Sequence, residues 1–342
     1  MIRVLLVDDS PSVRAVLKRF FSRTRDIRVV GEAADGAQAV QAVIELQPHV
    51  VVMDLQMPVL DGYQATEQIM AVRPTPIVVL SSRANRNQMQ TAFEAMRRGA
   101  LEVLPKPEDT ASWQQLADSL PETVRAVAEA RAAPRAPRAR AVRPAALTAA
   151  PAALRWVAIG ASTGGPAAIR EFFDAVPAEA PVGFLIVQHI ASGFELGFAD
   201  WLNKEFPFDV RLAKDGEVLR RGAVRLAPGG SHLRLEADGV LRLDSETPPR
   251  RGHRPSVDEL FHSCAVHCPR EVAAVLMTGM GADGVEGLLA LRRAGGVTLV
   301  QDEASSVVFG MPRVALEKGA ADVALPPRAL ARTLVRLWSE ER

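Results

Sequence analysis

The sequence is poor in the features that mark secreted, membrane-spanning or nucleic-acid-binding proteins. Its 342 residues include 2 cysteines, which are too few for a disulfide framework. No run reaches the roughly 18 apolar residues that a transmembrane helix needs, and the first apolar stretch is too short for a signal-peptide core. The 41 basic and 40 acidic side chains give a formal net charge of +1, so no global field favours nucleic acid or an anionic membrane. These absences predict a cytoplasmic protein whose charged sites are local.

The composition is that of an ordinary globular protein with more than one domain. Apolar residues make up 48% and charged residues 24% of the chain, which excludes wholesale disorder. At about 100 to 200 residues per domain, the length predicts two domains. Residues 131–143 read RAAPRAPRARAVR, a basic, proline-containing run in which apolar periodicity stops. We therefore predict a first domain over residues 1–120, a flexible linker over 121–153 and a second domain over 154–342.

The basic run has a second interpretation. Clustered arginines can bind the phosphate backbone of a nucleic acid. No aromatic residue is interleaved in the run and no recognition-helix pattern flanks it. We therefore favour the linker and predict no nucleic-acid partner.

The first domain alternates short β-branched runs with amphipathic stretches. Strands are predicted near residues 4–7, 28–33, 50–53, 77–80 and 102–104. The segments between them have helical patterns, and Ser10 and Pro11 suit the N-cap and the first turn of the first helix. This alternation predicts a parallel sheet with helices on both faces.

Polar residues follow four of these strands. Asp8 and Asp9 follow the first strand, Asp54 the third, Ser81 the fourth and Lys106 the fifth. The carboxyl ends of parallel strands meet at the ligand crevice of an open α/β sheet. Three carboxylates gathered there repel each other and need a hard divalent cation such as Mg²⁺, while an ammonium and a hydroxyl beside them suit a phosphoryl group. Aspartates after strands also cap turns and helices, but capping does not account for all five positions.

The segments VLLVDDS, VVMDLQMPVLDG, VVLSS and LPKP resemble the receiver domain of two-component response regulators. The resemblance implies a phosphoacceptor at Asp54, Mg²⁺ ligands at Asp8, Asp9 and Asp54, a switch hydroxyl at Ser81 and a phosphoryl contact at Lys106. Many receivers carry an aromatic residue three positions before this lysine. Val103 stands there in this chain, which argues against an aromatic-rotamer switch.

The second domain begins with a strand, a glycine turn and a helix. Residues 156–159 read as a buried strand, GASTGGP follows, and apolar residues then recur at helical spacing. In this G-x-S-x-G pattern, Ser162 lies outside the sheet beside free backbone N–H groups, which suits a nucleophile with an oxyanion site. A glycine-rich phosphate loop or plain turn chemistry would use the same residues. The full G-x-G-x-x-G fingerprint of the phosphate loop is missing.

Two further buried strands end in residues that could assist this serine. Residues 184–188 lead to His189, and residues 272–277 lead to a glycine-rich turn that contains Asp283. A parallel sheet would bring Ser162, His189 and Asp283 to one edge. There His189 can take the proton of the serine and Asp283 can orient the imidazole. The chain order Ser, His, Asp differs from the order Ser, Asp, His of the α/β-hydrolases, so that fold is disfavoured.

Other assignments compete with this triad. His232 and His253 are alternative bases, although neither follows a buried strand of the same kind. A histidine at a strand end is often a hydrogen-bonded structural residue, and an aspartate before a helix is often a cap. A further group has a spacing that requires a metal site to be weighed: His262, Cys264, His267 and Cys268. Structural zinc sites usually take two ligands from a second segment, which this chain lacks, so we expect a partly buried helix instead.

The second domain resembles the catalytic domain of the chemotaxis protein-glutamate methylesterases, which are also glutamine deamidases. The matching segments are IGASTGGP, IVQHI, LAPGGSHL, HRPSVDELF, MTGMGADG and QDEASSVVFGMP. The resemblance implies Ser162 as the nucleophile, His189 as the base and Asp283 as its orienting partner. It also implies hydrolysis of glutamate γ-methyl esters on the cytoplasmic helices of chemoreceptors, with a chemotaxis histidine kinase as the phosphodonor and no cofactor for the hydrolase.

The resemblance further implies that the unphosphorylated receiver covers the serine until Asp54 is phosphorylated. We expect oxyanion donors around Thr163 and Gly164 or at Met280 and Gly281. Two other functions use the same residues: a phosphorylation-dependent interaction module of a non-motility chemosensory system, or a nucleic-acid regulator acting through the basic linker. The predicted fold class is α/β, with two doubly wound parallel-sheet domains, one flavodoxin-like and one Rossmann-like.

Overall fold

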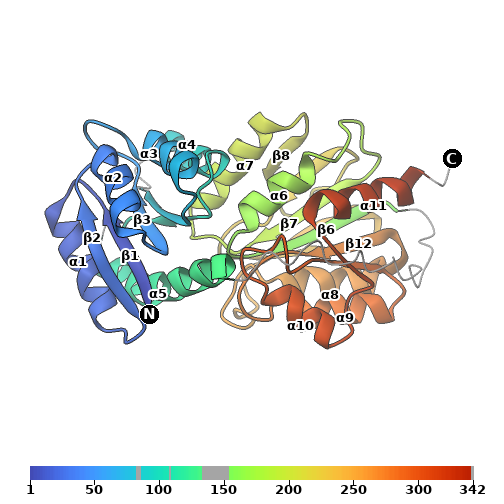
Figure 1. Ribbon diagram of the computed structural model, residues 1–342. Helices are drawn as coiled ribbons and strands as arrows, with labels where there is room; N and C mark the ends of the chain where they lie inside the picture. The colour runs from blue at the N-terminus through green and yellow to red at the C-terminus, as the bar shows by residue number, and fades with distance from the viewer. Residues whose placement is uncertain (82–85, 108, 133–153, 340–342) are drawn as a thin grey trace. The chain divides into compact units, whose positions relative to one another are not determined.

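The computed structural model describes residues 1–81, 86–107, 109–132 and 154–339. The chain divides into two compact units, Met1–Pro134 and Arg135–Arg342, which we call the N-terminal and C-terminal units. In each unit a parallel sheet is covered by helices (Figure 1). The predicted α/β fold class is thereby confirmed.

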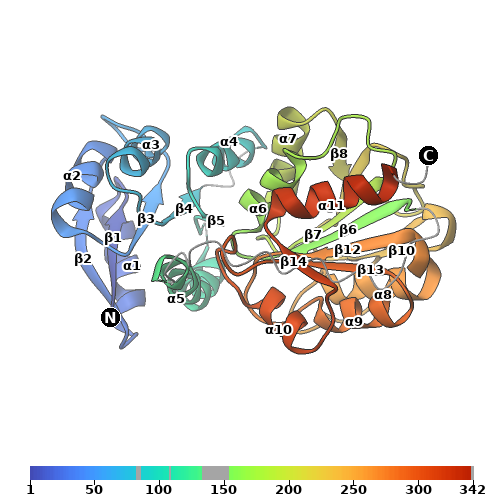
Figure 2. The same ribbon diagram turned by 45° about the vertical axis from the view of Figure 1, so that its right-hand side comes forward.

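The N-terminal unit is a five-stranded doubly wound sheet. Its strands run parallel in the order β2-β1-β3-β4-β5, which is the flavodoxin-like order. Helix α1 contacts α5; helix α3 contacts both α2 and α4 (Figure 2). The elements are β1 (Ile2–Val7), α1 (Pro11–Ser22), β2 (Ile27–Ala33), α2 (Gly36–Leu46), β3 (Val50–Asp54), α3 (Gly62–Val72), β4 (Ile77–Ser81), α4 (Arg86–Arg97), β5 (Glu102–Pro105) and α5 (Thr110–Ala132).

Local sequence signals account for most of these boundaries. Each predicted strand lies inside an observed one. Ser10 caps α1 by accepting a hydrogen bond from the Val13 amide, with Pro11 in the first turn, as the sequence predicts. Strands β3 and β4 are buried along their whole length, as expected for central strands covered on both faces.

The predicted end of the first domain at residue 120 is wrong, because helix α5 continues to Ala132. Pro121 lies inside this helix, where its ring removes one backbone hydrogen bond. The helix continues because Leu120, Val124 and Val127 are buried at helical spacing on the core side. The rest of the predicted linker, residues 133–153, lies outside the described residues.

The C-terminal unit is a seven-stranded doubly wound sheet with a small antiparallel pair, β10-β11, beside it. The large sheet is parallel throughout, in the order β14-β13-β12-β6-β7-β9-β8. Its strands are β6 (Trp156–Ala161), β7 (Gly183–Gln188), β8 (Asp209–Leu212), β9 (Ala223–Leu226), β12 (Val272–Leu276), β13 (Val297–Gln301) and β14 (Val323–Leu325). The antiparallel pair is β10 (His232–Leu235) and β11 (Leu241–Asp244).

Helices cover both faces of this sheet (Figure 1). One group is α6 (Gly165–Phe173), α7 (Phe194–Glu205) and α11 (Pro327–Ser339); the other is α8 (Val257–His267), α9 (Val285–Arg293) and α10 (Met311–Glu317). Two 3-10 turns, η1 (Ala237–Gly239) and η2 (Pro269–Glu271), complete the unit. Under α8 and α9 the core includes Trp156, Phe261 and Leu276, and on the α6 side Phe173 and Phe184 pack edge to face. None of the helices in the described residues is long and apolar enough to cross a membrane.

Candidate active site and phosphorylation pocket

The acidic residues of the N-terminal unit meet at the carboxyl ends of β1 and β3, which are adjacent strands. The carboxylate oxygens of Asp8, Asp9 and Asp54 lie within 4.8 Å of one another. Asp8 and Asp54 are buried, whereas Asp9 is exposed. Oxygen ligands of this kind, with one side open to solvent, fit a hard divalent cation such as Mg²⁺ that keeps several waters.

A lysine links two of these carboxylates. Lys106 Nζ lies 2.8 Å from an oxygen of Asp8 and 2.8 Å from an oxygen of Asp54. The Lys106 amide donates to the Ser81 carbonyl, which places both residues at the same edge. Burial raises the pKa of Asp54, and the nearby Lys106 offsets only part of this effect. Four of the five residues predicted from strand ends therefore gather in one pocket, and the fifth, Ser81, lies at the same edge of the sheet. Val103, three residues before Lys106, is a buried aliphatic residue of β5.

Ser162 lies in the turn between β6 and α6. Its amide donates to the Thr278 carbonyl and its carbonyl accepts from the Gly165 amide, so the serine is tied both to its own turn and to the loop after β12. Gly279 belongs to that loop and approaches Ser162 so closely that an added Cβ would lie 2.6 Å from the serine Cβ. Only glycine permits this approach, so the loop after β12 lies against the serine at this residue.

His189 follows β7 directly and lies next to the serine turn. Ala161 and Gln188 are paired across β6 and β7, so the residues after them, Ser162 and His189, leave the sheet side by side. His189 Nε2 lies 2.8 Å from Asp283 Oδ2. Its Nδ1 is buried, and neither this nitrogen nor the Ser162 hydroxyl has a hydrogen-bond partner among the described residues. The structure thus joins the predicted histidine and aspartate and places the serine beside them without a closed hydrogen bond.

Asp283 is held by a dense set of hydrogen bonds at the start of α8. Besides His189, it accepts bonds from the Ser256 hydroxyl and from the amides of Val257, Asp258 and Gly284. The amides of Val257 and Asp258 are free N–H groups of the first helical turn, so Asp283 caps α8 from outside the helix. Burial by itself raises the pKa of Asp283, but these bonds outweigh it and hold that pKa well below its usual value.

Sequence reasoning missed several residues that support this arrangement. The Gln188 side chain donates to the carbonyls of both Ser162 and His189, at 2.8 and 2.9 Å. The Thr278 hydroxyl donates to the Thr163 carbonyl and accepts from the Val308 amide. Gln188 directly precedes His189 and Thr278 follows β12. Their position at strand ends is the sequence feature from which their place in the site could have been predicted.

The two competing histidines have different surroundings. His232 is fully buried; its Nδ1 accepts from the Ser256 amide and its Nε2 faces the Pro248 carbonyl, so both nitrogens are used in holding the chain. His253 instead stacks on His189. His262 contacts Arg250, while Cys264 is fully buried. Among the described residues, the one group of three or more His, Cys, Asp or Glu side chains close enough to share a metal ion is Asp8, Asp9 and Asp54.

Comparisons with known proteins agree with this two-part arrangement. The model of the CheB methylesterase family matches residues 157–334, and the response regulator receiver domain model matches residues 4–118. This chain belongs to the CheB methylesterase family. It is therefore an enzyme of the methylesterase class that carries a response regulator receiver domain, and the predicted enzyme class is confirmed.

Relatives of the family resemble the chain along its whole length. A protein-glutamate methylesterase/protein-glutamine glutaminase of Anaeromyxobacter dehalogenans is 44% identical over 99% of both chains. A protein of the same name from Geobacter metallireducens is 41% identical over 100% of both. The crystal structure of the Thermotoga maritima CheB methylesterase catalytic domain covers 54% of this chain and 99% of its own, with 34% identity and a TM-score of 0.51. Receiver domains in general use Mg²⁺ for phosphorylation, and the acidic pocket described above provides suitable ligands.

Proposed function

We propose that this enzyme hydrolyses γ-methyl esters of glutamate side chains, and deamidates glutamine side chains, on the cytoplasmic helices of methyl-accepting chemoreceptors. Ser162 is the nucleophile, His189 the general base and Asp283 the residue that orients it. The observation that carries this proposal is the His189–Asp283 pair standing beside a serine at adjacent strand ends. Because its substrate lies on the cytoplasmic side, we place the enzyme in the cytoplasm, with no insertion into the membrane.

We infer a direction of proton transfer that the His189–Asp283 contact supports. Because Asp283 stays ionised, it accepts a hydrogen bond from the Nε2–H of His189, which leaves the lone pair of Nδ1 to take a proton. Ser162 attacks the ester carbonyl as His189 Nδ1 removes the hydroxyl proton, and His189 then protonates the leaving methanol. Water frees the acyl-enzyme by the same route and yields glutamate. A glutamine substrate loses ammonia in place of methanol. Substrate binding commonly closes serine–histidine contacts that are open in the free enzyme.

The oxyanion of the tetrahedral intermediate needs donors close to the serine. The amides of Met280 and Gly281 donate no hydrogen bond to a described residue, and Gly279 holds their loop against Ser162. The Ser162 amide is engaged with Thr278, so it does not serve. We therefore favour the Met280 and Gly281 amides over those near Thr163 as oxyanion donors.

The acidic pocket supplies the control of this reaction. Asp54 accepts a phosphoryl group from a chemotaxis histidine kinase, with Mg²⁺ held by Asp8, Asp9 and Asp54. Lys106 is placed to contact the phosphoryl oxygens, because its ammonium already lies on Asp54. Ser81 supplies the hydroxyl that senses the group. Bound Mg²⁺ would neutralise charge on the transferring phosphoryl group, which the clustered carboxylates alone would repel.

The activity is tested by measuring methanol release from membranes that contain methylated chemoreceptor. Ser162→Ala should lower the rate by at least about 10⁴-fold, because an acylated serine is required. Ser245→Ala, at an exposed serine of the same unit, is the matched control and should keep the wild-type rate. Persistent demethylation by Ser162→Ala would show that the nucleophile is assigned to the wrong residue. Labelling of Ser162 by a fluorophosphonate separates an enzyme from a pure interaction module.

The control is tested by adding acetyl phosphate and Mg²⁺ to the full chain. We expect faster methanol release from the wild type and no stimulation of Asp54→Asn, because the amide cannot accept the phosphoryl group. The unstimulated rates of the two proteins should agree. Stimulation that survives in Asp54→Asn would place the phosphoacceptor elsewhere.

A further inference from the structure

His253 lies on the face of the proposed base. Its ring is parallel to that of His189, with an interplanar angle of 8° and 3.7 Å between the ring centroids. Beyond this stack, the His253 side chain has no hydrogen bond or ion pair within the part of the chain that the structure describes. Burial, followed by the proximity of His189, lowers the pKa of His253.

A tight turn presents this ring. The Arg250 amide donates to the His253 carbonyl and the His253 amide donates to the Arg250 carbonyl, at 3.0 and 2.9 Å. The two residues between them, Arg251 and Gly252, have φ angles of 51° and 86°. Positive φ at both central positions defines a type I′ turn, which glycine adopts freely. Arg251 carries a Cβ and pays about 1 kcal/mol for this conformation, so the surrounding contacts must hold the turn in place.

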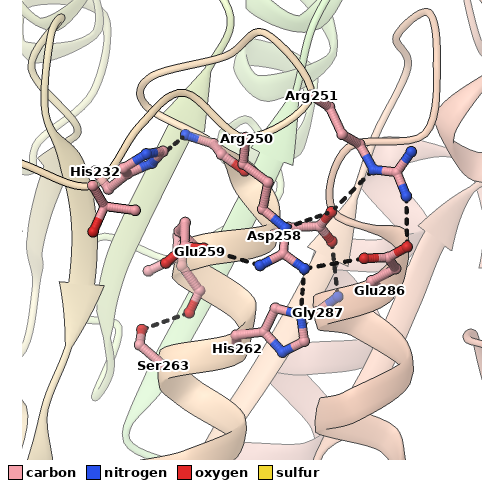
Figure 3. Close-up of polar contacts among 12 residues, drawn as sticks. His232, Arg250, Arg251, Asp258, Glu259, His262, Ser263, Glu286 and Gly287 are labelled. Carbon is pink, nitrogen blue, oxygen red and sulfur yellow. Dashed lines mark hydrogen bonds and ion pairs between the residues drawn. The ribbon is translucent and has the colours of Figure 1, made fainter.

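Acidic residues of two helices hold the turn (Figure 3). The Arg250 guanidinium lies 3.0 Å from Glu259 and 3.0 Å from Glu286. Arg251 lies 2.5 Å from Glu286 and 3.6 Å from Asp258. Asp258 is fully buried, and it also accepts a bond from the Gly287 amide at 2.8 Å. The turn is therefore fixed to the first turns of α8 and α9.

The same end of α8 holds both partners of His189. Its first amides bind Asp283, which contacts the edge of the His189 ring, and its acidic side chains anchor the turn that brings His253 to the face of that ring. One hydrogen bond at Nε2 fixes a point on an imidazole but leaves its plane free to tilt. A second ring stacked on the face removes that freedom.

We propose that His253 is a positioning residue of the reaction, which keeps the His189 plane aligned so that Nδ1 faces Ser162. The role rests on the proposed function of the triad. The stacked surface of the ring is what matters, and the ring nitrogens of His253 take no part in proton transfer. A phenyl ring should therefore replace the imidazole, whereas a methyl group should not.

The test uses the full chain stimulated with acetyl phosphate and compares His253→Ala, His253→Phe and the exposed His267→Ala as a matched control. His253→Ala should lower kcat for methanol release about 10- to 100-fold with KM changed less than about twofold, because the base is misaligned while the substrate still binds. His253→Phe should recover kcat to within about threefold of the wild type. His267→Ala should match the wild type. Unfolding midpoints show that each variant is folded.

A kcat of His253→Phe as low as that of His253→Ala would overturn the proposal, because the nitrogens would then be needed. A raised KM at unchanged kcat would also overturn it and make His253 a substrate contact. The rate of Ser162 labelling by a fluorophosphonate is the second measurement, and it does not depend on the methyl ester being the substrate. Slower labelling of His253→Ala that His253→Phe restores would support the positioning role even if the wild type released no methanol, a result that would remove only the proposed substrate.

Discussion

The two sites occupy equivalent places in their sheets but are built from opposite electrostatics. Each lies at the carboxyl ends of neighbouring strands around the point where the strand order reverses, β1 and β3 in one unit and β12, β6 and β7 in the other. In the N-terminal unit three carboxylates cluster, and one lysine contacts two of them. In the C-terminal unit one carboxylate, Asp283, receives five hydrogen bonds. The same edge of the same type of sheet therefore supports two different chemistries.

The pKa shifts of the two central aspartates express this difference. Burial raises the pKa of Asp54, so its negative charge is costly until a cation or a phosphoryl group changes the pocket. Burial also acts on Asp283, but hydrogen bonds from His189 and the α8 terminus lower its pKa. The pocket around Asp54, whose charge changes on phosphorylation, is thus only partly neutralised. Asp283, which must stay charged while it orients His189, accepts five hydrogen bonds.

The largest effect that would sharpen this comparison is expected from Asp283→Asn. The asparagine amide keeps the size of the carboxylate, but its NH₂ group faces the N–H and O–H donors that bind Asp283. It also stabilises the wrong tautomer of His189. We expect the rate of methanol release to fall about 10³- to 10⁴-fold. Asp322→Asn is the matched control, because that carboxylate is also buried and hydrogen-bonded, to Thr298, but is remote from the serine. A loss of less than about tenfold in Asp283→Asn would mean that Asp283 only caps α8.

The strand ends explain how much of both sites could be predicted. Asp8, Asp54, Ser81 and His189 each end or follow a strand, so periodicity alone places them at the edge of a parallel sheet. The pairing of His189 with Asp283 also follows from this argument, although Asp283 lies seven residues beyond the end of β12. The triad roles remain a prediction, since the Ser162 hydroxyl makes no hydrogen bond to His189 in this structure.

Loop geometry explains what could not be predicted. The donors to Asp283 come from Ser256 and the start of α8, and a hydrophobic pattern carries no information on which loop folds over which strand end. The sequence makes His253 an alternative base that is disfavoured because it follows no buried strand, yet a type I′ turn brings it onto His189. The domain boundary was misplaced for another reason. The first domain was predicted to end at residue 120, whereas burial of later residues maintains its last helix to Ala132.

Ser256→Ala should have an intermediate effect. It removes the hydroxyl donor to Asp283 and leaves four of the five bonds, and one bond to a charged acceptor is worth about 1.5 to 3 kcal/mol. We expect kcat for methanol release to fall about tenfold, because Asp283 then holds His189 less firmly. Ser263→Ala, on α8, is the matched control: its buried hydroxyl accepts from the Leu235 amide of β10 and donates to the Leu260 carbonyl of its own helix. Equal activity of the two variants would show that Ser256 supports only the fold.

The smallest effect concerns stability against acid, and it should differ between the two units. The pKa of Asp283 in the folded protein lies below its unfolded value of about 3.9. Ionised Asp283 therefore stabilises the C-terminal unit above about pH 3.9, and this stabilisation is lost as the pH falls through the folded pKa. Wild type should therefore be more stable than Asp283→Asn at pH 7, and the difference should narrow below about pH 4. Hydrogen exchange read separately for each unit measures this difference.

Asp54→Asn provides the matched comparison in the N-terminal unit under metal-free conditions. It removes one of three neighbouring negative charges and leaves Lys106 paired with Asp8. The N-terminal unit of Asp54→Asn should therefore be better protected from hydrogen exchange at pH 7 than that of the wild type, whereas Asp283→Asn should lower the protection of the C-terminal unit. Opposite signs at the two positions would follow directly from the two kinds of charge environment. Loss of protection in both variants would mean that the acidic pocket, like the triad aspartate, is already neutralised by its own hydrogen bonds.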